Sequence, residues 1–187
     1  SHYDRFMTQE HPDLKEKFYP MVTARGQNTI GAGDTQAIQV WPNDIPKALY
    51  HTDWVADRTL DWLDQRQDED PWFCWMSFPD PHHPWDPPAS ETHRVNWRDV
   101  PLPSLYSEDK AEMQALLATK PKHWQGYYDG TVWTNLESPR DFIPRDMTPD
   151  QVREINAMNH IENELIDDAC GRVIDWLKAK GWYDNTD

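Results

Sequence analysis

The chain has 187 residues, a formal net charge of −15 and eleven tryptophans. This length and composition predict one folded domain rather than a disordered segment. The acidic balance argues against a nucleic-acid partner and against an anionic membrane surface, because both would need a basic patch on the protein.

Residues 1–50 show little periodicity. We expect a short helix within residues 4–18 and a loop over residues 26–33, whose glycine spacing matches neither the Walker nor the dinucleotide-binding pattern. A longer helix is predicted over residues 52–66, with Thr52 or Asp53 as its N-cap. Its apolar face is expected to contain Val55, Thr59, Trp62 and Leu63.

A short apolar run at residues 72–78 follows this helix. A continuous run of this length that is rich in aromatic residues indicates a strand buried on both faces. A helix followed by a buried strand forms half of a βαβ unit. We therefore predict an α/β fold, with a mixed, mainly parallel sheet flanked by helices and incomplete in this chain.

The apolar run is ended by a proline-rich loop with the sequence PDPHHPWDPP at residues 79–88. Proline cannot donate to a sheet ladder, and it restricts the residue before it. The predicted strand would therefore deliver Asp80, His82 and His83 to its carboxyl end, where ligands bind in open α/β sheets. This loop is the candidate site.

The region from residue 85 to residue 146 reads as mostly irregular, with one helix at about residues 107–119 that is capped by Ser107. Six aromatic side chains of this region either line a pocket or pack beneath long loops. They are Trp97, Tyr106, Trp124, Tyr127, Tyr128 and Trp133.

The last predicted helix has the clearest signals. Thr148 to Gln151 form a capping box with proline at the first helical position, and Gly181 is the natural end. A helix of this length is expected to bend, near Gly171. Apolar residues recur every three or four positions at Val152, Ile155, Met158, Ile161, Leu165, Ala169, Val173 and Leu177.

The two cysteines, Cys74 and Cys170, lie within apolar patterns and are expected to be buried free thiols. They indicate no cellular compartment, and the localisation stays unknown. The set His82, His83 and His93 lacks a fourth ligand at a recognisable zinc spacing, so we predict no metal ligand in this chain. Asp167 and Asp168 point about 100° apart on a helix, which favours a solvated face.

Three blocks of this sequence resemble segments of the sulfatases, within the alkaline-phosphatase-like superfamily. They are YHTDWVADRTLDWLDQ, the Pro-His-x-Pro loop at residues 81–84, and ENELIDDACGRVIDWLKAKGWYDNTD. Their order and spacing also fit, so the resemblance spans roughly residues 45–187. It implies that residues 1–187 form the middle part of a single sulfatase-type catalytic domain.

The resemblance implies a hydrolase of sulfate esters, with a large mixed sheet between helices. Its nucleophile is a formylglycine, made from the cysteine or serine of a Cys/Ser-x-Pro/Ala-x-Arg motif, and a divalent cation, usually calcium, completes the site. Neither Cys74 nor Cys170 lies in such a motif. The segment with the nucleophile and the C-terminal metal-ligand segment are therefore expected outside this chain, which would be inactive alone.

One catalytic position of the family matches this sequence. His82 corresponds to the histidine of the Pro-His-x-Pro pattern, which contacts the sulfate and assists departure of the leaving group; His83 takes that place if the alignment shifts by one residue. A histidine can be protonated near neutral pH, so it can stabilise a sulfuryl oxygen and donate a proton. Asp80 would orient one of the rings or join a hydrogen-bond network.

The implied partner is a small-molecule sulfate ester. A phosphonate monoester or phosphodiester hydrolase of the same superfamily is the alternative, because their middle regions are alike. A different class is a non-catalytic, aromatic-rich binding module, built on the tryptophan loops.

Overall fold

A computed structural model of the chain describes residues 2–14, 17, 31–66, 71–132 and 141–186. The α-helices are α1 (His2–Glu10), α3 (His51–Asp64), α4 (Lys110–Leu117), α5 (Lys122–Tyr128) and α6 (Pro149–Lys180). Short 3-10 helices lie at Pro12–Leu14, Lys47–Leu49, Ala89–Arg94, Trp97–Asp99, Pro144–Asp146 and Tyr183–Asn185. No helix among the described residues is both long and apolar enough to cross a bilayer.

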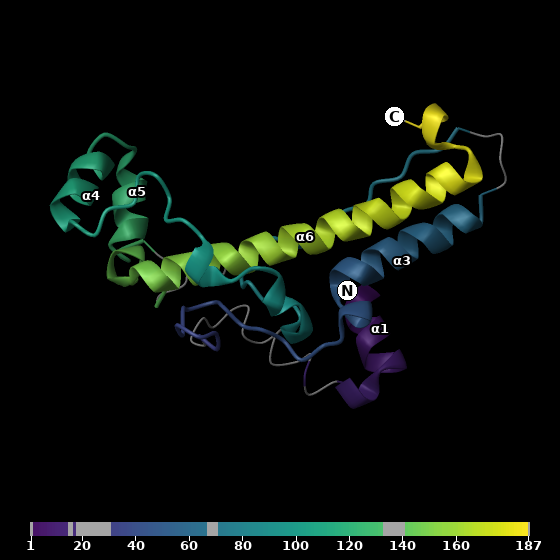
Figure 1. The fold of residues 1–187 in the computed structure, drawn as a ribbon, viewed down its shortest axis with the longest axis horizontal. Helices are drawn as coiled ribbons and strands as arrows, with labels where there is room; N and C mark the ends of the chain where they lie inside the picture. Colours follow the sequence, from purple (N-terminus) through teal and green to yellow (C-terminus); the bar gives the residue numbers. More distant parts are fainter. Residues whose placement is uncertain (1, 15–16, 18–30, 67–70, 133–140, 187) are drawn as a thin grey trace.

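Helix α6 is the axis of the molecule (Figure 1). The capping box is formed: Thr148 Oγ1 accepts the Gln151 N–H at 3.2 Å, and Gln151 Oε1 accepts the Thr148 N–H at 2.9 Å. The helix runs without a break through Gly171 and ends at Gly181, whose φ of 73° is the left-handed conformation that glycine favours. The predicted limits of this helix are confirmed.

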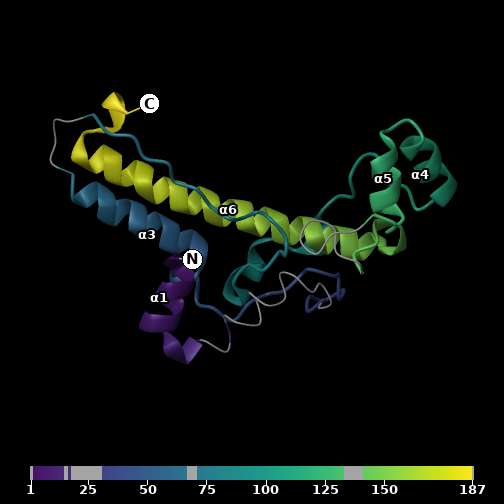
Figure 2. The ribbon, with the colours of Figure 1, turned by 180° about the vertical axis from the view of Figure 1, so that it is seen from behind.

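The core follows one face of α6. Ile155, Met158, Ile161 and Leu165 are buried there, together with Tyr50 and other side chains from the preceding segments. Helix α3 packs beside the second half of α6, and both run in the same direction (Figures 1 and 2). The contact is polar at its edge. The Trp176 indole donates to Asp64 at 3.0 Å, and Lys180 lies 3.4 Å from the same carboxylate.

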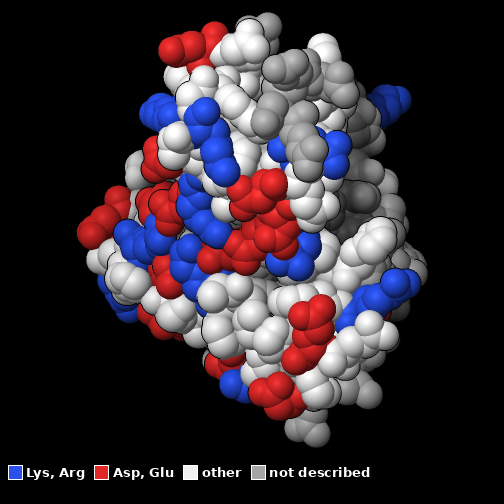
Figure 3. All heavy atoms as spheres, turned by 90° about the vertical axis from the view of Figure 1, so that its right-hand side faces the viewer, with Lys and Arg blue, Asp and Glu red and all other residues white. Residues whose placement is uncertain are grey.

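The end of the molecule where α3 and α6 terminate carries acidic and basic side chains side by side (Figure 3). Arg172 on α6 makes an ion pair with Asp57 on α3 and lies 3.8 Å from Asp53. Exposed ion pairs of this kind individually contribute little to stability.

Residues 72–78 are extended, but they do not form the predicted strand buried on both faces. Alternate side chains are half-buried, whereas Phe73 and Trp75 are 79% and 80% exposed. Among the described residues, no backbone hydrogen bond joins this segment to another. It runs back along α6 as a single extended strip (Figures 1 and 2).

The predicted α/β fold with a mainly parallel sheet is therefore wrong for this structure, which is helical and contains no sheet in its described part. The β-pairing there amounts to two isolated parallel bridges, Val40 with Trp85 and Asn43 with Pro88. A strand buried in a parallel sheet is hydrogen-bonded to strands along its edges and covered by helices on both faces, whereas residues 72–78 run along α6 with every second side chain exposed.

Further expectations need correction. Helix α3 begins at His51 with Tyr50 as its N-cap residue rather than Thr52 or Asp53, and the region from residue 85 to residue 146 contains a second helix, α5.

The helix predicted at residues 107–119 begins at Lys110, because Asp109 rather than Ser107 accepts the Ala111 N–H, at 2.8 Å. Cys74 and Cys170 are free, as predicted, but both are half-buried rather than buried. Burial raises the pKa of the Cys170 thiol, and the charge of Asp167 adds to this effect.

Candidate functional site

The proline-rich loop at residues 79–88 is held by backbone contacts with an earlier segment. The Trp85 N–H donates to the Gln39 carbonyl at 2.8 Å, and the Trp41 N–H donates to the Trp85 carbonyl at 2.9 Å. Further along, the Asn43 N–H donates to the Pro87 carbonyl at 3.0 Å. These bonds use the few backbone groups that a proline-rich sequence leaves available, so the second half of the loop is fixed.

The first half of the loop is fixed by the side chain of Asp80, which is 6% exposed. Its Oδ2 atom accepts hydrogen bonds from the Tyr50 hydroxyl at 2.8 Å and from the Thr52 hydroxyl at 3.1 Å. Its Oδ1 atom lies 3.4 Å from Nε2 of His51. Asp80 therefore joins the base of the loop to the N-terminal turn of α3, in the predicted role of a network member.

His82 lies between these two anchored halves and is exposed. Its Nδ1 atom is 2.6 Å from the carbonyl oxygen of His83. A carbonyl can only accept, so Nδ1 carries the hydrogen, and Nε2 is the nitrogen with the lone pair in the neutral ring. This contact fixes the tautomer and the orientation of the ring, as a proton-donating histidine requires.

His83 is half-buried, and its ring stacks on that of His82 with 4.4 Å between centroids. The His83 ring also lies near that of Trp85, with 5.9 Å between centroids. Asn159 on α6 donates to the Pro81 carbonyl at 3.4 Å, which holds the same turn from the opposite side. The structure thus brings His82 and His83 together on one surface, in line with their sequence, and their functional roles stay predictions.

A buried cluster of ionisable groups lies beneath this loop. His51, Asp80 and Asp86 each offer a ligand atom, and these three atoms lie within 4.8 Å of one another. The neighbouring carboxylate of Glu162, fully buried on α6, accepts the Asp86 N–H at 2.9 Å. Burial raises the pKa of the Tyr50 hydroxyl well above its usual value, and the charges of Asp86, Asp80 and Glu162 raise it further.

Sequence reasoning missed His51, Asp86 and Glu162, and it predicted no metal ligand in this chain. The three residues come from segments far apart in sequence, so no spacing rule connects them. One signal was available. Glu154 and Glu162 stand beside the apolar positions of α6, and an acidic residue at the buried side of a helix usually has a polar partner.

The other residues considered from sequence lie outside this cluster. His93 is exposed in the 3-10 helix Ala89–Arg94, where its Nδ1 atom lies 2.7 Å from the Ser90 carbonyl. Asp168 is exposed and accepts a 2.7 Å hydrogen bond from Arg94, so it lies on the solvated face of α6, as predicted. Trp124 and Tyr127 are exposed on α5, and Trp133 lies outside the described residues.

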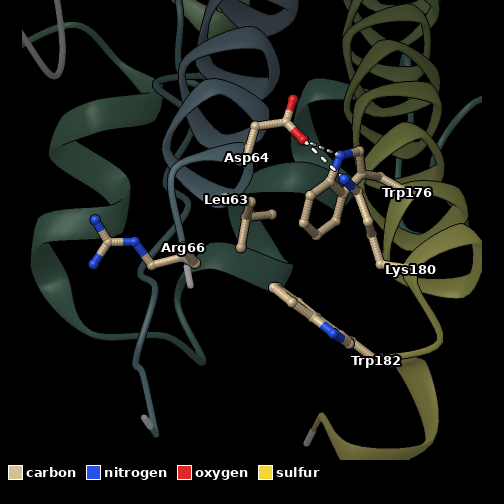
Figure 4. Close-up of a pocket in the computed structure, with 6 residues that line it drawn as sticks. All are labelled: Leu63, Asp64, Arg66, Trp176, Lys180 and Trp182. Carbon is tan, nitrogen blue, oxygen red and sulfur yellow. Dashed lines mark hydrogen bonds and ion pairs between the residues drawn. The ribbon is translucent and has the colours of Figure 1, made fainter. Parts of the chain in front are cut away.

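A cavity of about 290 Å³ lies at the far end of α3, between Leu63, Asp64, Arg66, Trp176, Lys180 and Trp182 (Figure 4). Its tryptophans are not those predicted to line a pocket. The Asp64 carboxylate in this cavity already accepts a hydrogen bond from the Trp176 indole and forms an ion pair with Lys180. Since the cavity shares no residue with the loop at residues 79–88, we assign the candidate site to the loop, on the chemistry of its side chains.

Known proteins similar in sequence to this chain include two sulfatases. The chain is 28% identical over 145 residues to an uncharacterized sulfatase of Schizosaccharomyces pombe, covering 75% of this chain and 24% of that protein. It is 38% identical over 57 residues to an arylsulfatase of Clostridium perfringens, covering 30% of this chain and 12% of the other. No protein-family model matches the chain.

A solved structure resembles the fold. The phosphonate monoester hydrolase of Agrobacterium radiobacter matches with a TM-score of 0.63 and 20% identity, over 92% of this chain and 33% of that one. The chain spans about a quarter or less of the length of the two curated relatives. Over this partial coverage, the chain is similar in sequence to two sulfatases and similar in fold to a phosphonate monoester hydrolase.

Proposed function

We propose that the chain is the middle part of a sulfatase-type catalytic domain, and that His82 serves its active site in the hydrolysis of a small-molecule sulfate ester. The observation that carries the proposal is the His82 ring, exposed at a loop anchored on both sides, with Nδ1 held by the His83 carbonyl. The sulfatase relatives support the class of enzyme.

The proposed chemistry uses the outward Nε2 atom of His82. When the ring is protonated, its positive charge stabilises a sulfuryl oxygen. As the bond between sulfur and the ester oxygen breaks, the Nε2 proton passes to the departing alkoxide or phenoxide, which leaves as a neutral alcohol. His83 stacks on this ring and would contact the same substrate oxygen from the neighbouring position.

Nucleophilic attack on sulfur is assigned, through the resemblance, to a formylglycine supplied by a segment outside this chain. The divalent cation of the family is likewise assigned to ligands outside it. Calcium takes six to eight oxygen ligands, whereas the His51, Asp80 and Asp86 cluster offers an imidazole nitrogen among three ligand atoms. This cluster therefore does not fit a calcium site.

A phosphonate monoester is the second candidate substrate, and the likeness to the phosphonate monoester hydrolase of Agrobacterium radiobacter is what favours it. The same imidazolium can serve either ester, since both reactions develop negative charge on the leaving oxygen. The two esters differ in the charge of the group transferred, which the loop alone does not distinguish.

The test compares His82→Ala with wild type, in the 187-residue chain and in the longest reading frame that encodes it. The substrates are a chromogenic aryl sulfate and a phosphonate monoester. We expect activity in the longer protein, with kcat reduced by at least 10²-fold in the variant.

His93→Ala is the matched control, because His93 is also exposed and also holds a backbone carbonyl through Nδ1. It should leave turnover unchanged. Equal activity in wild type and in folded His82→Ala would overturn the role of His82, and a loss in His83→Ala instead would move that role by one residue. Absence of turnover with both esters would overturn the proposed function.

A further inference from the structure

We propose that His51, Asp80 and Asp86 form a binding site for one first-row divalent metal ion, preferentially Zn²⁺, beneath the loop that carries His82. The proposal does not depend on the hydrolase function. It rests on the buried cluster itself, whose three ligand atoms lie within 4.8 Å of one another.

The separations within the cluster fit metal ligation. The Nε2 atom of His51 and the Oδ1 atom of Asp80 are 3.4 Å apart. Two ligands bound to zinc at about 2.0–2.1 Å with tetrahedral angles lie roughly 3.4 Å apart. The third ligand atom, from Asp86, is within 4.8 Å of both, so a shift of roughly 1 Å completes the set at normal zinc distances.

Neighbouring groups hold two of the ligands in a suitable orientation. Nδ1 of His51 lies 3.4 Å from the Thr52 hydroxyl, which itself donates to Asp80. The hydroxyl can accept the Nδ1 hydrogen, which makes Nε2, on the side of Asp80, the nitrogen that would bind the ion. Tyr50 donates to Oδ2 of Asp80 and leaves Oδ1 on the side of His51. Such supporting hydrogen bonds are typical around metal ligands.

The donor set decides which ion is preferred. One imidazole nitrogen and two carboxylate oxygens suit zinc and its neighbours, whereas calcium and magnesium require oxygen ligands. Burial favours a cation as well, since His51, Asp80 and Asp86 are 3%, 6% and 1% exposed and Glu162 is fully buried beside them. An ion at this place lies among carboxylates that the protein has removed from water.

The bound ion would have a structural consequence for the loop. His51 belongs to the first turn of α3, Asp80 lies at the start of the loop, and Asp86 lies near its end. A single ion would therefore join both ends of the His82 segment to one helix. The ion would limit the distance between the two ends of the loop without contacting its exposed tip.

The experiment measures zinc binding to the 187-residue chain at low micromolar concentration, after treatment with a chelator and dialysis. Titration calorimetry should show one Zn²⁺ per chain, and thermal melting should shift upward by several degrees with zinc but not with Ca²⁺. His51→Ala and Asp86→Asn should each abolish the stoichiometric binding. His93→Ala and Asp99→Asn remove an exposed histidine and an exposed aspartate, and should retain it.

Absence of stoichiometric binding in the wild type would overturn the proposal, and so would binding that survives in folded His51→Ala and Asp86→Asn. If those variants fail to fold, Co²⁺ added to the wild type decides the matter. A four-coordinate d–d spectrum supports the site, and a spectrum like that of aqueous Co²⁺ rejects it. A slowly exchanging Nε2 proton of His51 in NMR spectra, retained when zinc is added, would show an imidazolium–carboxylate ion pair in its place.

Discussion

The hydroxyl of Tyr50 donates a 2.8 Å hydrogen bond to the carboxylate of Asp80, and both side chains are buried. Tyr50 is the N-cap residue of α3, and Asp80 precedes the His-His pair by two positions. This one contact joins the helix that packs on α6 to the loop that carries the candidate catalytic histidine. The position of the loop therefore depends on the interior of the protein.

Tyr50→Phe should lower the free energy of unfolding by about 1–3 kcal/mol, because it removes a donor from a buried carboxylate while it preserves the ring. Denaturant titration followed by tryptophan fluorescence measures the effect. Tyr183→Phe is the matched control, since Tyr183 is 46% exposed and its ring lies beneath the ammonium group of Lys178 in the last turn of α6. Equal stability of the two variants would contradict the importance of the Tyr50–Asp80 bond.

A second prediction concerns the cap of α6. Thr148→Ala removes the side-chain acceptor for the Gln151 N–H and should cost about 1 kcal/mol of unfolding free energy. Thr119→Ala, at an exposed threonine beyond the end of α4 whose hydroxyl donates to the Leu116 carbonyl, should change stability by less than half as much. Thermal melts of the two variants and the wild type provide the comparison. A smaller effect at Thr148 than at Thr119 would contradict it.

Local signals in the sequence were sufficient to predict α6. The capping box, the apolar period and Gly181 all act within a few residues of where they stand, so no tertiary information was needed. The irregular loop that carries His82 and His83 was also predicted, because its prolines do not continue a strand, while the roles of the two histidines stay predictions. The start of α4 was displaced, since Ser107 and Asp109 are both good caps and only the structure shows which one accepts the Ala111 N–H.

The sheet could not be judged from sequence. An apolar run such as residues 72–78 indicates an extended segment, but whether neighbouring strands cover both of its edges depends on other parts of the chain. The buried cluster of ionisable groups beneath the loop could not be predicted from the sequence for a related reason. His51, Asp86 and Glu162 come from a helix start, a loop and the middle of another helix, and their approach is a property of the fold.

Acid stability should depend on Glu91. Burial raises the pKa of this carboxyl, but hydrogen bonds from Arg94 and Ser90, with the charge of Arg94, outweigh that effect and lower the pKa overall. A folded-state pKa below the unfolded value means that the stabilisation is present above about pH 4.5 and is lost as the pH falls through the folded pKa.

Glu91→Gln should therefore lower the melting temperature at pH 6, where the Arg94 pair is intact in the wild type, and should flatten the decline of stability below about pH 4.5. Glu108→Gln, at an exposed carboxyl without a hydrogen bond to an arginine among the described residues, is the control. Parallel acid profiles for wild type and Glu91→Gln would argue against the contribution of this ion pair.

The extended segment at residues 72–78 should make the 187-residue chain associate with itself. Its backbone forms no hydrogen bond with other described residues, and Phe73 and Trp75 are 79% and 80% exposed on one face. An unpaired apolar strip of this kind is a template for a second strand.

Sedimentation velocity between roughly 1 and 100 µM should show growing association with concentration, and Trp75→Lys should suppress it. Leu105→Lys, at an isolated side chain that is 65% exposed, should leave it unchanged. A wild-type chain that stays monomeric and melts cooperatively across this range would show that the strip is protected in solution.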